Sequence, residues 1–76
     1  MNRQETIKEI NKELQSIQLR IASCDKVLKE LESTGQAWAI DSRRYRINEA
    51  AKYKFLTMAA ELKQWRKGLK DIALDL

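Results

Sequence analysis

The chain lacks histidine and proline altogether, and it has one cysteine and two glycines among its 76 residues. Without histidine, neither a Cys/His zinc site nor a Ser-His or Cys-His catalytic pair can form within it. Cys24 has no partner in the chain for a disulfide, which favours a reducing compartment. The apolar runs are short and the first residues are polar, so we expect no membrane span and no secretory signal. We therefore expect no catalytic site, metal, cofactor or small-molecule substrate.

The composition favours a small folded protein. Charged residues make up 34% of the chain and hydrophobic residues 43%, which is typical of a folded domain in contact with water. A domain of this length buries only about 60% of the surface that its unfolded chain exposes. We expect one domain, residues 1–76, that gains stability from a partner or from copies of itself as a homo-oligomer.

The first half of the chain carries an unbroken heptad pattern. Its apolar residues are spaced alternately by three and four positions: Ile7, Ile10, Leu14, Ile17, Ile21, Cys24, Leu28 and Leu31. This spacing predicts an amphipathic helix over about residues 2–32, roughly 45 Å long. Leu19 and Val27 lie off this stripe, and we interpret them as a second, weaker contact surface.

The last third repeats the pattern. Its stripe consists of Ala51, Phe55, Met58, Leu62, Trp65, Leu69, Ile72 and Leu76. The pattern predicts a second helix over about residues 48–75, with Asn48 as its N-cap. Gly35 comes directly after the first stripe, where a turn glycine is expected. Two matched helices with a short connection predict an antiparallel pair, although the heptads could instead pair between chains.

The connection, residues 33–47, alternates in its hydrophobicity. Trp38 and Ile40 share one face of an extended chain, and a two-residue turn at positions 41–42 places Tyr45 and Ile47 on the same face. This pattern predicts a short β-hairpin whose core is formed by these four residues. The alternative is that the second helix extends back to about Gln36. We favour the hairpin because the heptad fails here, so the expected fold is mostly α, with two long antiparallel amphipathic helices joined by a β-hairpin-like connection.

The net positive charge of the chain comes entirely from its second half. Basic and acidic residues balance through Ser33, and the net charge of +4 comes from the residues after it. The densest cluster consists of Arg43, Arg44 and Arg46, continued by Lys52 and Lys54. Such a cluster is either a solvated surface or a contact for nucleic acid or an acidic protein. Contact with DNA phosphates would be independent of base sequence.

Two segments resemble a known family. The stretch Gly35-Gln36-Ala37-Trp38-Ala39-Ile40-Asp41-Ser42-Arg43-Arg44-Tyr45-Arg46 leads into the second helix, which carries Leu62-Lys63-Gln64-Trp65-Arg66-Lys67-Gly68-Leu69. This order is similar to that of the small helix–hairpin–helix proteins encoded among the head genes of tailed bacteriophages, of which the gpW-type head–tail joining (head completion) proteins are the best known. Gly35, Gln36, Trp38, Ile40, Arg43 and Tyr45 match the first motif, and Trp65, Lys67 and Leu69 match the second.

The resemblance implies a structural virion protein, made in the host cytoplasm and assembled as a ring on the phage portal. A protein of this kind helps to retain packaged DNA and offers a docking site for other neck and tail proteins. We expect Leu19, Val27, Tyr53 and Leu56 to contact neighbouring copies or the portal, and the basic cluster to face DNA or an acidic partner.

Two other functions are compatible with the same residues. One is a small dimeric helical protein that binds nucleic acid, with the heptads of two chains forming a four-helix bundle. The other is a regulatory protein or inhibitor that binds an enzyme of the host or of a rival.

Overall fold

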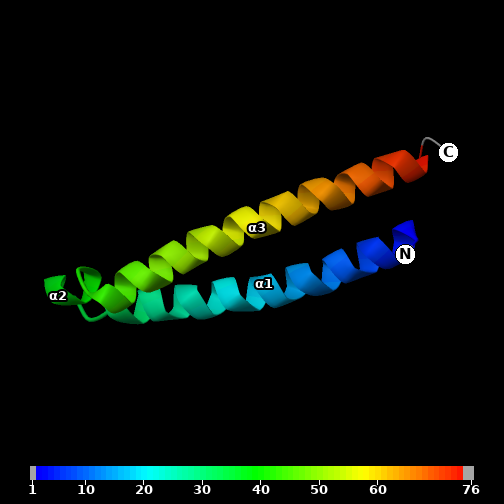
Figure 1. Ribbon diagram of the computed structural model, residues 1–76. Coiled ribbons are helices and arrows are strands. Elements are labelled where there is room, and N and C mark those ends of the chain that lie inside the picture. Colours follow the sequence, from blue (N-terminus) through cyan, green and yellow to red (C-terminus); the bar gives the residue numbers. More distant parts are fainter. Residues whose placement is uncertain (1, 75–76) are drawn as a thin grey trace.

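The computed structural model describes residues 2–74 and consists of two long helices joined by a short helical connection (Figure 1). Helix α1 spans Arg3–Glu32, α2 spans Ala37–Ile40 and α3 spans Arg43–Leu74. Helices α1 and α3 run antiparallel and contact each other within one chain, while α2 lies at the turn. The molecule is a rod of 57 × 16 × 15 Å. The predicted pair of antiparallel amphipathic helices is confirmed.

Helix α1 follows the prediction of a helix over about residues 2–32. Asn2 is its N-cap, and the Asn2 side-chain Oδ1 accepts a hydrogen bond of 2.8 Å from the backbone N–H of Glu5. Lys29 lies in the last turn, where a cation interacts favourably with the helix dipole. The chain leaves the helix through Gly35, whose φ of 69° is readily adopted only by glycine. The expected turn glycine is therefore confirmed.

The core is narrow and comes mainly from α1. Its central cluster consists of Ile10, Leu14 and Ile17, packed around Ala59 of α3. Larger residues of both helices surround this cluster and are only partly buried: Ile21, Phe55, Met58, Leu62 and Leu69. Cys24 is buried, as its place in the heptad predicts. Two helices form a single layer, so most apolar side chains have protein on one side only.

The connection is not a β-hairpin, and this prediction is wrong. No strand occurs within residues 2–74, and positions 37–40 form a short helix instead. Ala39 is fully buried against the long helices, whereas Trp38 and Ile40 are exposed. Four alternating residues fit one helical turn as well as a strand, and two of them are alanine, the best helix former.

Helix α3 begins five residues earlier than predicted because Ser42 acts as its N-cap. The Ser42 Oγ accepts a hydrogen bond of 3.2 Å from the backbone N–H of Tyr45, and its carbonyl accepts one of 3.1 Å from Arg46. Asn48, the predicted cap, lies inside the helix and donates to the Arg44 carbonyl. Tyr45 is half-buried and Ile47 is exposed, so these residues and α2 do not form the predicted hairpin core.

The face that α3 turns toward α1 also differs from the predicted stripe. Trp65 was expected in the seam but is 54% exposed, and Ala59, which the stripe omits, is 6% exposed and belongs to the core. Arg66, beside Trp65, is the residue that reaches across to α1. The helix is therefore rotated so that part of its apolar stripe faces solvent. The predicted seam positions at Ile72 and Leu76 lie outside the residues whose side chains are described.

We predict that Leu14→Ala lowers the free energy of unfolding by about 3 kcal/mol, because it leaves a cavity beside Ile10, Ile17 and Ala59. The matched control is Leu56→Ala, in which the same atoms are removed from a side chain that is 43% exposed. We expect this control to change stability by no more than about 0.5 kcal/mol. Urea unfolding of both variants at one protein concentration measures the difference, and equal losses would contradict the assigned core.

Candidate interaction surfaces

The two helices lie side by side, so the hairpin has two broad faces and a tip. One of them, which we call the polar face, carries hydrogen bonds between side chains of α1 and α3. They join Asn11 to Arg66, Asp25 to Lys52, and Glu32 to Tyr45, with distances of 2.7, 2.8 and 2.8 Å. From one pair to the next, the residue number on α1 increases and that on α3 decreases by the same amount, as an antiparallel heptad register requires. These contacts hold the two helices in one alignment.

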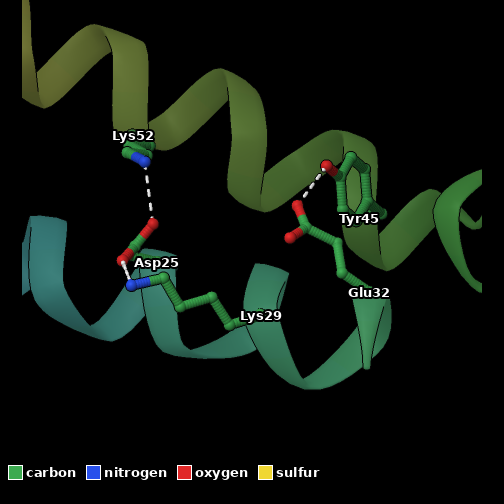
Figure 2. Close-up of polar contacts among 5 residues, drawn as sticks. All are labelled: Asp25, Lys29, Glu32, Tyr45 and Lys52. Atoms are coloured by element: carbon green, nitrogen blue, oxygen red, sulfur yellow. Dashed lines mark hydrogen bonds and ion pairs between the residues drawn. The ribbon is translucent and has the colours of Figure 1, made fainter. Parts of the chain in front are cut away.

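Asp25 is the most connected group on this face (Figure 2). Its carboxylate accepts a hydrogen bond from Lys52 Nζ at 2.8 Å and forms an ion pair with Lys29 Nζ at 3.0 Å. The hydrogen bond from Lys52, followed by the one from Lys29, lowers the pKa of the Asp25 carboxyl below its usual value. The same contact with Asp25 raises the pKa of Lys52. Lys52, predicted to contact an outside partner, is therefore engaged within the chain.

Tyr45 and Glu32 form the polar contact nearest the tip (Figure 2). The Tyr45 hydroxyl donates a hydrogen bond of 2.8 Å to Glu32 Oε1. This bond, together with the nearby carboxylate charge, raises the pKa of the Tyr45 phenol. Through this bond the half-buried Tyr45 joins the start of α3 to the end of α1, instead of belonging to the predicted hairpin core with Trp38.

The tip combines exposed apolar side chains with exposed arginines. Trp38 is 64% exposed and Ile40 is 47% exposed on α2. Arg43, Arg44 and Arg46 follow in the first turn of α3, and all three are exposed. Within residues 2–74 none of these arginines forms an ion pair with an acidic side chain. The tip therefore offers exposed arginines on α3 and an exposed indole ring on α2.

The other predicted contact residues do not form one surface. Lys54 is exposed, like the arginines, but lies further along α3. Leu19, Tyr53 and Leu56 are exposed and Val27 is half-buried, as residues outside the seam should be. They are divided between α1 and α3, and the helical periodicity places Tyr53 and Leu56 on the outer side of α3, away from Leu19 and Val27.

Two kinds of site do not occur in the part of the chain that the structure describes. No three His, Cys, Asp or Glu side chains gather there as metal ligands. No helix within it has both the length and the apolar character needed to cross a bilayer. Cys24 is buried in the seam, where it packs as a small apolar side chain.

Comparisons with protein-family models, curated proteins and solved structures found no match.

The polar pairs and the exposure of Trp65 were not predicted from the sequence. A signal for the pairs was present, because Asn11, Asp25 and Glu32 are spaced by multiples of seven on α1, as Tyr45, Lys52 and Arg66 are on α3. Polar residues that repeat at heptad spacing beside a seam are typical of contacts between paired helices. The exposure of Trp65 follows once Arg66 is placed on the polar face.

We predict that Asp25 stabilises the hairpin in a pH-dependent way. Because the pKa of Asp25 is lower in the folded chain than in the unfolded chain, its contribution is fully present above the unfolded pKa and is lost as the pH falls through the folded pKa. Asp25→Asn should therefore lower Tm at neutral pH and leave it almost unchanged at acid pH, where the carboxyl is protonated in both states. Thermal unfolding followed by circular dichroism measures this. A loss of the same size at both pH values would show that packing, and not charge, is responsible.

Proposed function

We propose that this chain is a non-enzymatic adaptor that docks the tip of its helical hairpin onto an anionic surface. We further propose that it serves as a head–tail connector of a tailed phage, assembling on the portal and helping to retain packaged DNA. The observation that carries the docking role is the cluster of Arg43, Arg44 and Arg46 at the tip, exposed and without an acidic partner in the described chain.

The position of these arginines is unfavourable for the isolated chain. The N-terminus of a helix carries a partial positive charge, so acidic residues are stabilising there and basic residues are not. The first turn of α3 contains no acidic residue. A surface of negative charge would relieve this repulsion, which supports an anionic partner over a purely solvated surface.

The exposed apolar residues of α2 support docking by contact as well as by charge. Trp38 and Ile40 project from a helix of four residues whose third residue, Ala39, is fully buried. An indole beside guanidinium groups is typical of interface centres, because both residue types are enriched there. At the tip, the apolar side chains would exclude water from a contact, and the arginines would pair there with acidic groups of the partner.

The phage assignment is supported by the two motifs that resemble the head–tail joining family. The long rod with a basic tip also suits a protein that bridges two larger assemblies. The strands that the resemblance implied do not occur in residues 2–74, so the support comes from the motif residues and the paired helices. We place the protein in the virion, with the portal and other neck or tail proteins as partners.

We predict that Arg43→Glu combined with Arg44→Glu leaves the fold intact and abolishes docking. In the phage or prophage that encodes the chain, a deletion complemented by this variant should yield DNA-filled heads that lose DNA or lack tails. Electron microscopy and the titre of infectious particles measure the defect. The matched control is Lys63→Glu with Lys70→Glu, which makes the same charge change at exposed positions far from the tip. Full complementation by the arginine variant would contradict the role of the tip.

The exposure of Trp38 also favours a second function, direct binding of nucleic acid by a dimeric protein. An exposed indole next to arginines can stack on an unpaired base, a contact worth about 1–3 kcal/mol. Under this alternative, Trp38→Ala should weaken binding to a fluorescent single-stranded oligonucleotide more than about fivefold. The wild-type affinity should also fall steeply with salt. An adaptor that recognises a protein surface should show neither effect.

A further inference from the structure

Opposite the polar face, the hairpin has an apolar face, which we call the open face. It is formed by Val27 of α1 and by Ile47, Ala51, Phe55, Met58 and Trp65 of α3. The helical periodicity aligns these α3 residues along one side of the helix. On α1, Val27 lies one heptad after Arg20, so these two residues lie on the same side of α1. Ile47 and Trp65 are 56% and 54% exposed, and the other residues are partly buried.

Two open grooves lie along this face. One, of about 360 Å³, is lined by Leu19, Arg20 and Cys24 of α1 together with Phe55, and the Arg20 guanidinium lies 5.6 Å from the centre of the Phe55 ring. The other, of about 250 Å³, is lined by Glu13, Glu61, Met58, Leu62 and Trp65. No hydrogen bond or ion pair between α1 and α3 closes this side in the described residues. The open face is therefore a long strip that is apolar along its middle, has charged residues beside its grooves, and has hollows that side chains could fill.

We propose that the open face packs against the same face of a second copy of the chain, giving an antiparallel four-helix bundle with two-fold symmetry. A standard interface buries about 800 Å² per partner, which is about 13% of the 5962 Å² that this chain exposes. A rod 57 Å long with an apolar strip along it can supply that area. The second copy would also cover the half-exposed side chains of this thin core with a second layer of helices.

The charges along the open face select a second copy in antiparallel orientation. Lys54 and Glu61 flank the strip on α3 and are equally distant from a point between Thr57 and Met58. A two-fold axis at that point brings Lys54 of each copy level with Glu61 of the other. A parallel arrangement would instead place Lys54 beside Lys54 and Glu61 beside Glu61. Along α3, the charges beside the strip are thus complementary in the antiparallel orientation.

The side-chain sizes agree with this two-fold axis. At 1.5 Å per residue, the axis brings Trp65 of one copy level with Ala50 and Ala51 of the other. The large indole therefore meets the small alanine side chains, while Met58, near the axis, meets its own counterpart. Large residues packed opposite small ones allow helices to interlock without voids.

The test is the oligomeric state of the purified chain across a concentration series, measured by sedimentation velocity. We expect the wild type to be a dimer. Lys54→Glu and Glu61→Lys should each weaken the dimer about tenfold, and the variant with both changes should recover wild-type association. Lys63→Glu, an exposed charge away from the open face, is the matched control and should have no effect. A wild-type monomer, or charge variants whose effects simply add, would overturn the proposal.

A second measurement tests the position of the axis. In a Cys24→Ser background, Met58→Cys places the new thiols of the two copies close together, whereas Tyr53→Cys places them on the outer surface. Under mild oxidation we expect Met58→Cys to form a disulfide-linked dimer several times faster than Tyr53→Cys. Equal rates would overturn the assigned face. Both results are independent of the proposed docking role, because the arginines of the tip take no part in this interface.

Discussion

The alignment of α1 against α3 is the constraint on which the other features depend. Three hydrogen bonds, from Arg66, Lys52 and Tyr45 of α3 to acceptors on α1, all lie on one face and share one antiparallel register. A shift of one residue along either helix would separate these polar partners and would also turn the apolar stripe out of the seam. The three hydrogen bonds accompany the rotation of α3 in which Ala59 lies in the core and Trp65 lies outside it.

The rotation divides the molecule into regions with different chemistry. One face is satisfied by contacts within the chain, and the other keeps apolar surface uncovered. The tip stands apart from both, because its charges come from the first turn of α3 and its apolar residues from α2. A helix directs successive side chains about 100° apart, so the three arginines spread around the tip, whereas on the predicted strand Arg44 and Arg46 would have pointed the same way.

How far the sequence predicts this structure differs between the two long helices. On α1 a single apolar stripe ends at a glycine, so its length, buried residues and turn follow from local rules. On α3 two adjacent stripes compete, one through Ala51, Met58 and Trp65 and the other through Lys52, Ala59 and Arg66. The outcome depends on Asp25 and Asn11, which lie on the other helix. The connection differs from the predicted hairpin because Ser42 serves as a helix cap, and a serine beside an aspartate suits a turn and a cap equally well. The cluster of arginines at the tip was readable from charge alone, but its helical setting was not.

The heptad register has a consequence for the length of the rod. Removing one heptad from α1 and the facing heptad from α3 would shorten the rod by about 10 Å and return every remaining residue to its original face. Removing a single residue from one helix would instead turn everything beyond it by about a quarter of a revolution, which would move the buried side chains out of the seam. The length of the hairpin can therefore change in steps of one heptad. In this way the distance to which its basic end extends can change over evolution, while the residues displayed at that end stay the same.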